Sequence, residues 1–172
     1  MAMISQGVLD AINEQINHEF FSAYIYLSMS AYFESSNLPG FANWMKIQAR
    51  EEVTHGLKLF DFVHNRGGRV VLKAIDAPPR EFKNVQEVFE QALKHEQLVT
   101  KMIHDLYEIA DQGHDFATQV ALQWFITEQV EEEKSADLIV EQLKMIGTDR
   151  PALLMLDREL GSRQPDASDS ED

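Results

Sequence analysis

The sequence contains no cysteine, which excludes disulfide bonds, thiolate zinc sites and rubredoxin-type iron centres. It also contains no run of about 18 uncharged apolar residues, which is the length that a transmembrane helix needs. The first residues, MAMISQGVLD, lack the basic start and the apolar core of a secretory signal peptide. From these absences we expect a cytoplasmic protein that has no membrane partner.

Basic residues are scarce as well. The chain carries 15 Lys and Arg against 29 Asp and Glu, which gives a formal net charge of -14. A surface of this sign repels nucleic acid and anionic membranes and attracts cations, so we expect no nucleic-acid partner. The charge by itself indicates only a soluble protein. It becomes informative about function if some of the carboxylates lie inside the fold.

Only eight glycines and five prolines interrupt the 172 residues, so the segments between them are long. Ser5 is a suitable N-cap for a first helix, and Asn84 with Glu87 has the spacing of a capping box. The predicted helices cover about residues 5–34, 39–66, 84–111, 114–145 and 151–160. Residues 69–83 form a long connection, and RVVLKAI within it is the one strand candidate.

Three of the connections are short and one is long, which is typical of a four-helix bundle with a single crossover between its second and third helices. Helices of about 28 to 32 residues would each span roughly 42 to 48 Å. The sequence therefore predicts an all-α fold: a four-helix bundle with one long crossover connection and a short fifth C-terminal helix. We assign residues 1–161 to this domain and expect the acidic tail 162–172, SRQPDASDSED, to be disordered.

The apolar stripe of each long helix is interrupted near its midpoint by a glutamate. The interrupting residues are Glu19, Glu52, Glu96 and Glu132, with His55 and Gln129 beside them. Midpoints of equally long helices meet at one height in a bundle, so these side chains should share one core layer. Burying carboxylates without partners costs several kcal/mol each, and the stripes contain no lysine or arginine. Multivalent cations are the remaining compensating charge, and the number of ligands indicates two.

Carboxylate and imidazole ligands together suit iron or manganese better than calcium, and the absence of thiolate argues against structural zinc. A lone core glutamate or histidine is more often a locally hydrogen-bonded group, but four coincident midpoints with a Glu-x-x-His pair favour a metal site. Tyr26 lies two turns from Glu19 on the same stripe. It is either a catalytic partner of the site or an ordinary core tyrosine. We interpret Trp124 as a packing residue.

Four segments, NEQINHEFFSAYIYLSMSAYF, EEVTH, KHEQLV and EQVEEEK, resemble the non-haem bacterial ferritins, and the likeness extends over about residues 4–161. Ferritin-like proteins are themselves a standard example of bundles with a di-iron carboxylate site. The resemblance implies a ferroxidase centre in which Glu19, Glu52 and His55 hold one iron. The implied ligands of the second iron are Glu52, Glu96 and Glu132, with Gln129 as a hydrogen-bonding group or weak ligand.

The resemblance also implies a third, adjacent iron site formed by Glu51, Glu128 and Glu131, although helical periodicity alone places these three among the surface acids. Bacterioferritins bind haem through a methionine directly after the second-helix glutamate, and Val53 stands there in this chain, so we expect no haem. They also carry a second Glu-x-x-His on the fourth helix, where this chain reads EEKS. Rubrerythrins in their usual form require cysteine, and the DNA-protecting miniferritins lack a fifth helix.

The function that the resemblance implies is iron storage. Fe(II) would be oxidised with dioxygen or hydrogen peroxide at the di-iron centre, and Fe(III) mineral would be deposited inside a hollow homo-oligomeric shell. The family implies twenty-four subunits, with the short fifth helix at the fourfold axes, where the apolar stretch ALLML would be covered. Glu108, Asp111 and Asp115 lie near the turn between the third and fourth predicted helices. They are weak candidates for lining an iron-conducting pore, and a solvated turn is the plainer interpretation.

Two rival functions fit the same residues. A small di-iron oxidase or peroxidase would detoxify oxidants without storing iron, and it would form no shell. A catalytically silent helical scaffold would keep its glutamates protonated or paired with other groups, and it would show no metal-dependent oxidation.

Overall fold

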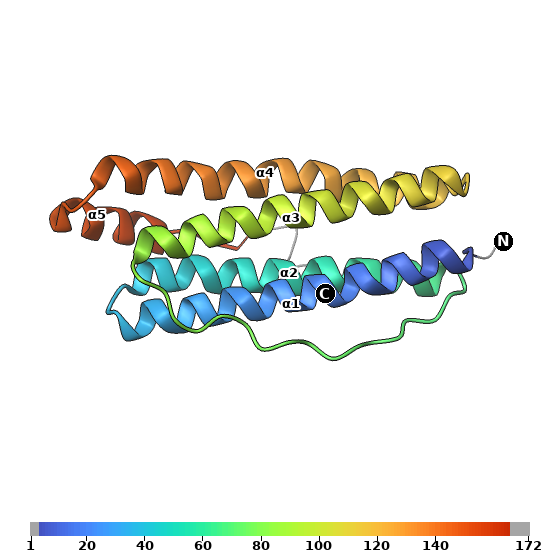
Figure 1. Ribbon diagram of the computed structural model, residues 1–172, viewed down its shortest axis with the longest axis horizontal. Coiled ribbons are helices and arrows are strands. Elements are labelled where there is room, and N and C mark those ends of the chain that lie inside the picture. Colours follow the sequence, from blue (N-terminus) through green and yellow to red (C-terminus); the bar gives the residue numbers. More distant parts are fainter. Residues whose placement is uncertain (1–3, 166–172) are drawn as a thin grey trace.

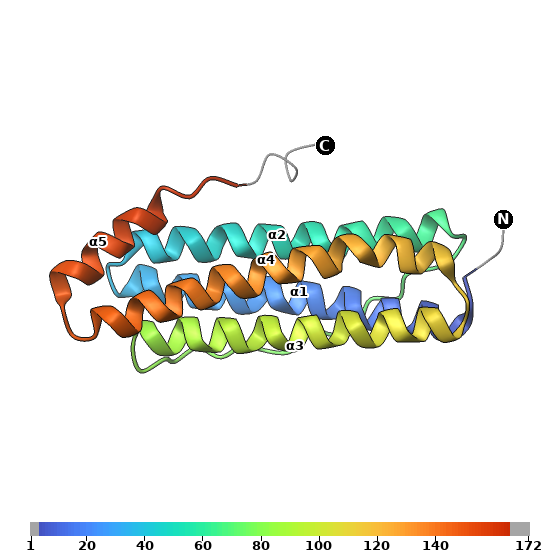
Figure 2. The ribbon, with the colours of Figure 1, turned by 90° about the horizontal axis from the view of Figure 1, so that it is seen from above.

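The computed structural model describes residues 4–165, and its regular elements within that range are five helices without a strand. The helices are α1 (Gln6–Ser35), α2 (Pro39–Asn65), α3 (Val85–Gln112), α4 (Phe116–Ile146) and α5 (Arg150–Gly161). Four of them are long and lie side by side, and α5 packs across one end of the bundle (Figures 1 and 2). The predicted all-α bundle with a short fifth helix is confirmed.

One long crossover joins α2 to α3 along the outside of the bundle, so these two helices run in the same direction (Figure 1). The strand candidate within it forms no strand, because no neighbouring strand is available to pair with its backbone. Val71 and Leu72 are exposed there, and the Val71 N–H donates instead to the Asn13 side chain at 3.0 Å. Of the predicted tail, residues 166–172 lie outside the described residues.

The helix starts follow the capping signals of the sequence. The Ser5 hydroxyl accepts a hydrogen bond from the Val8 N–H, and the Asn84 side chain accepts one from the Glu87 N–H at 2.8 Å. The fourth helix begins slightly later than predicted because His114 has a positive φ of 51°. Asp115 is the N-cap of that helix and accepts a hydrogen bond from the Thr118 N–H at 3.1 Å.

The core consists of two apolar clusters, one toward each end of the bundle. The cluster beneath α5 is built around Phe33, Phe41 and Phe89, whose ring centroids lie 5.2, 5.6 and 5.8 Å apart. The other contains Ile12 and Ile16, which are fully buried. Between the two clusters lies a layer of buried polar side chains, at the height where the helix midpoints meet.

The fifth helix is fastened to the start of α2 by a close backbone approach. The Asp157 carboxylate, itself buried, accepts a hydrogen bond from the Phe41 N–H at 2.9 Å. A Cβ at Gly40 would lie 1.6 Å from the Asp157 backbone oxygen. Of the apolar residues in this helix, Leu156 is buried against the bundle, whereas Leu154 and Met155 are exposed. The apolar face of α5 is therefore only partly used within one subunit.

Replacing Gly40 by alanine is expected to dislodge α5, because its new methyl group has no space at the Asp157 backbone. We expect a loss of about 1 to 3 kcal/mol in the free energy of unfolding, as for other overpacked sites. Thermal unfolding and proteolysis of residues 147–165 measure the effect. Gly7→Ala is the matched control, since a Cβ at Gly7 meets nothing within 4 Å. Equal stability of the two variants would contradict this account of α5 docking.

Candidate metal centre

The polar layer brings together one or two side chains from each long helix, and all of them are nearly inaccessible to solvent. Its members are Glu19 from α1, Glu52 and His55 from α2, Glu96 from α3, and Gln129 and Glu132 from α4. The most exposed of the six, Glu132, retains only 6% of its accessible surface. The six residues that the sequence placed at the helix midpoints therefore do lie inside the fold.

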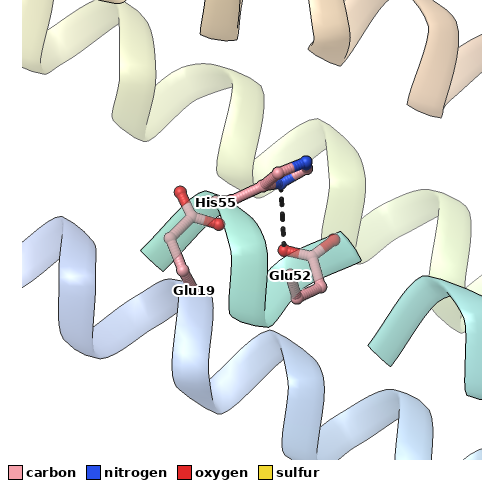
Figure 3. A group of neighbouring side chains, drawn as sticks. All are labelled: Glu19, Glu52 and His55. Atoms are coloured by element: carbon pink, nitrogen blue, oxygen red, sulfur yellow. Dashed lines mark ion pairs between the residues drawn. The ribbon is translucent and has the colours of Figure 1, made fainter. Parts of the chain in front are cut away.

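Glu19, Glu52 and His55 form a compact group in which the potential ligand atoms lie within 4.8 Å of one another. In Figure 3 their polar ends face a shared space, and His55 Nδ1 lies 3.7 Å from Glu52 Oε2. The Gln15 side chain donates a hydrogen bond to Glu19 Oε1 at 2.8 Å. Glu19 Oε2 and Glu52 Oε2 are the only buried side-chain nitrogen or oxygen atoms of residues 4–165 that have no hydrogen-bond partner. Such orphaned carboxylate oxygens fit a cation.

A second group places His55 with Glu128 and Glu132, again with ligand atoms within 4.8 Å. Because His55 belongs to both groups, the structure places two candidate cation positions next to each other. Glu128 was expected to accompany Glu51 and Glu131. Within the described chain, neither of those two acids joins a group of this kind.

Burial makes these carboxyls hard to ionise while no cation is present. It raises the pKa of Glu52 and of Glu132 well above the ordinary value, and the negative charge of Glu96 adds to the rise. Burial also raises the pKa of Glu96, and it raises that of Glu19 to about 7 although a hydrogen bond from Gln15 opposes the change. The metal-free layer therefore retains protons that an incoming cation would displace.

Burial has the opposite effect on the imidazole. It lowers the pKa of His55 to about 4, and the positive charge of Lys58 contributes. His55 is therefore neutral near pH 7, the form in which a ring nitrogen has a lone pair for a metal. The Trp124 ring packs edge-on against the His55 ring, with centroids 5.3 Å apart. Trp124 thus has the packing role expected of it.

Tyr26 is fully buried, and its hydroxyl donates to Glu96 Oε1. Its partner is therefore a carboxylate on α3, although the sequence associated it with Glu19 on its own helix. Gln129 also faces Glu96: its side-chain nitrogen donates to the Glu96 carboxylate and to the backbone oxygen of Glu96, both at 3.2 Å. In this arrangement Gln129 offers Glu96 a donor, which matches the hydrogen-bonding role foreseen for it.

Two residues beside the layer, Gln48 and Arg163, were not predicted from the sequence. Gln48 lies one turn before Glu52 and donates to Glu132 Oε2 at 2.7 Å, so its place on the same stripe could have indicated it. Arg163 comes from the segment expected to be disordered, yet its guanidinium contacts Glu51 and Gln48. No sequence pattern signals this contact, because Arg163 is separated from both partners by more than a hundred residues.

A cavity of about 670 Å³ opens beside the layer, between α2, α4 and α5. Its charged lining residues are Glu51, Glu128, Glu131, Glu132, Glu159 and Arg163. The three acids of the implied third iron site all line this cavity. Their exposure differs: Glu51 is 5% exposed, Glu128 is half-buried and Glu131 is exposed. The prediction from helical periodicity that Glu51 lies on the surface was therefore wrong.

The acids considered for a pore lie at or near the turn between α3 and α4. Asp115 pairs with Arg66 at 2.9 Å and caps α4. Glu108 and Asp111 are exposed, and Asp111 accepts a hydrogen bond from Gln119 at 2.9 Å. Within one subunit these contacts favour a solvated turn over a pore lining. Among residues 4–165, no helix combines the length and apolar character that a membrane span requires.

A family model described as a ferritin-like domain matches residues 9–146, which is most of the chain. The chain belongs to the ferritin-like family. This ferritin-like chain is 42% identical over 164 residues to a bacterial non-heme ferritin of Staphylococcus haemolyticus, covering 95% of this chain and 99% of that protein. It is 41% identical over 161 residues to one of Staphylococcus aureus, covering 94% and 97%. The resemblance found in the four sequence segments is confirmed.

Solved ferritin structures have a closely similar fold. An open-pore ferritin of the hyperthermophilic archaeon Archaeoglobus fulgidus superposes with a TM-score of 0.94 at 54% identity, covering 95% of this chain and 100% of that one. A closed form of the ferritin from the same organism, engineered by site-directed mutagenesis, superposes with a TM-score of 0.93 at 54% identity, covering 94% and 98%. In this ferritin-like chain the four glutamates and His55 lie inside the four-helix bundle. Proteins of the ferritin-like family bind iron.

Proposed function

We propose that this protein stores iron. It oxidises Fe(II) with dioxygen or hydrogen peroxide in the polar layer and deposits Fe(III) as mineral inside a shell of twenty-four copies. The observation that carries the proposal is the pair of orphaned oxygens, Glu19 Oε2 and Glu52 Oε2, on the two buried carboxylates that group with His55. The relatives named bacterial non-heme ferritins support it, and so does the close match to archaeal ferritin structures.

The proposed sites share ligands. One Fe(II) is held by Glu19, Glu52 and His55, and a second by Glu52, Glu96 and Glu132. Substrate iron bound at these positions supplies one electron per ion, so two adjacent ions can reduce the same oxidant molecule. A third, more weakly held ion lies among Glu51, Glu128 and Glu131 in the adjoining cavity. No haem takes part, which is consistent with Val53 in place of a haem-binding methionine.

The protein's own groups move protons and keep the ligands in place. Raised pKa values mean that the metal-free carboxyls hold protons, which leave as Fe(II) binds. His55 is neutral and needs no deprotonation, because burial keeps its pKa at about 4. Tyr26 and Gln129 both donate to Glu96 and fix the direction of its carboxylate. Tyr26 is thereby poised to act beside the reacting ions, which is the catalytic role we propose for it.

Exposed apolar side chains support assembly into a shell. Tyr24 and Leu27 on α1 are about half exposed, and they line one surface depression with Pro78 of the crossover. Leu154 and Met155 of α5 are exposed as well. Apolar side chains that lie next to one another on a surface, as Tyr24 and Leu27 do, often mark a protein–protein contact. Light scattering on the purified protein gives the mass of the assembly directly.

The proposal is tested by anaerobic Fe(II) titration of the metal-free protein, followed by oxygen addition while ferric absorbance is recorded. We expect a binding break at two or three irons per chain, then rapid oxidation and continued soluble loading far beyond that ratio. A break at two without further loading would instead identify a small di-iron oxidase. Only the slow oxidation of free iron, without any break, would leave the helical scaffold as the better description.

A further inference from the structure

The segment that follows α5 returns to the bundle and inserts one side chain, Arg163, beside the metal layer. Its Nη2 atom donates to both oxygens of the Glu51 carboxylate, at 2.9 and 2.8 Å, and its Nη1 atom donates to Gln48 Oε1. The guanidinium also lies over the Trp44 ring, 5.0 Å from its centroid. Arg163 is thus bound by charge, hydrogen bonding and stacking at once.

These contacts connect Arg163 to a candidate iron ligand. Gln48 is fully buried, and while its oxygen accepts from Arg163 its nitrogen donates to Glu132 Oε2 at 2.7 Å. Glu51, the other partner, directly precedes Glu52 in the sequence and is itself 5% exposed. The guanidinium therefore lies between the proposed two-iron layer and the adjoining cavity.

Arg163 is also the one basic residue among the described residues that line this cavity, and five glutamates share the lining with it. A cation entering the cavity meets the guanidinium already placed on Glu51. Two positive charges cannot occupy the same carboxylate without repelling each other. Metal binding by Glu51 therefore requires Arg163 to move away.

The backbone around Arg163 is held by few hydrogen bonds, one of them from the Arg163 N–H to the Leu160 backbone oxygen at 3.2 Å. Arg163 lies two residues after the end of α5 at Gly161. The Asn43 side chain donates to the backbone oxygens of Gly161 and Arg163 over long distances of 3.4 and 3.3 Å. Bonds of this length are weak, so most of the cost of releasing Arg163 lies in its side-chain contacts with Glu51, Gln48 and Trp44.

We propose that Arg163 is a built-in competitor for the third iron site: it occupies Glu51 in the metal-free protein and must be displaced before an ion binds there. This inference rests on the proposed function, because it assumes that Glu51, Glu128 and Glu131 receive an ion. The guanidinium keeps this site weak and leaves the two core positions to fill first.

Calorimetric titration of the assembled, metal-free protein with Zn(II), which is redox-silent, tests the competition. In Arg163→Ala we expect a third ion to bind at least about tenfold more tightly than in the wild type, or to be detected only in the variant. The first two ions should change by less than about threefold. Arg163→Lys retains the charge and should keep the third ion weak. Arg158→Ala, which removes an exposed arginine of α5, is the matched control.

An unchanged or weakened third ion in Arg163→Ala would overturn the competition. If the wild type binds no ion in the core layer, the proposed function itself fails, and that result is recognisable from the wild-type titration alone. A second measurement needs no substitution. Amide hydrogen exchange of residues 160–164 should be unchanged by two equivalents of Zn(II) and become faster with the third. Exchange that ignores the third equivalent would show that Arg163 is not displaced.

Discussion

Replacing Glu52 by glutamine is expected to abolish rapid Fe(II) oxidation and to remove the two-ion break from the anaerobic titration. Glu52 is 1% exposed, carries one of the two orphaned oxygens and lies beside His55. Both proposed ions share its carboxylate, so a neutral amide weakens both positions at once. Groups that only orient a metal ligand cost about 10- to 100-fold when removed. Loss of the shared ligand itself should therefore lower the oxidation rate by more than about 100-fold.

The matched control is Glu90→Gln, which makes the same change of charge at an exposed position on α3. It should oxidise iron at the wild-type rate and bind the same number of ions. Stopped-flow ferric absorbance gives the rate, and circular dichroism verifies that both variants keep their helices. Wild-type oxidation in Glu52→Gln would remove this residue from the centre and would favour a different arrangement of ligands.

The metal-free protein is expected to lose stability as the pH rises from about 5 to about 7. Burial raises the pKa of Glu19 to about 7 in the folded chain, from an ordinary value of 4.5. A carboxyl shifted in this direction contributes stability while it is protonated, below its unfolded pKa, and loses that contribution as the pH rises through its folded pKa. For Glu19 alone the difference corresponds to about 3 kcal/mol. Glu52, Glu96 and Glu132 are shifted the same way.

Three imidazoles act against this trend, because burial also lowers the pKa of the partly buried His18. Burial lowers the pKa of His55 and of His95 to about 4 in the folded chain. Their unfolded forms bind protons between about pH 4 and 6.5, so their contribution to stability rises with pH over that window. Four carboxyls outnumber these three imidazoles below pH 6.5, and above it only the carboxyls of this set still titrate. The net stability of the metal-free protein should therefore decrease up to neutral pH.

Bound metal should reverse this dependence, because a cation replaces the protons on the same oxygens. Saturation with Zn(II) at 1,000 times its dissociation constant would add about 4 kcal/mol. Thermal unfolding of metal-free and Zn(II)-loaded protein at pH 5, 6 and 7 measures both effects. Glu52→Gln should flatten the metal-free profile and reduce the gain from metal. A metal-free midpoint that climbs steadily from pH 5 to 7 would refute the proposed protonation of the core layer.

The architecture and the core layer could be predicted because both depend on short-range regularities. Helix starts follow from local caps such as Ser5 and Asn84, whose side chains bond to amides three residues away. The 3.6-residue period shows which face of each helix is buried. It therefore showed that the apolar stripes are interrupted by four acidic residues, Glu19, Glu52, Glu96 and Glu132. Equal helix lengths then place those residues at one height.

Helical periodicity failed where another element covers a helix from outside the bundle. Glu51 lies off the apolar stripe of α2 and was assigned to the surface, but the segment after α5 covers it and leaves it 5% exposed. The docking of α5 depends on Gly40 and Asp157, which lie far apart in the sequence, and nothing in the sequence of either helix indicates their contact. Likewise, Tyr26 was expected near Glu19 on its own helix, yet its hydroxyl bonds to Glu96 on α3.

By itself, the amino-acid sequence determined the five helices, the long crossover and the set of buried carboxylates with His55, because each depends on residues within a few turns of one another. Only the tertiary structure decided which ligand atoms meet. It grouped Glu128 with His55 and Glu132, and it placed the guanidinium of Arg163 on Glu51. Such contacts depend on side-chain directions across different helices, and no periodicity along one helix specifies them.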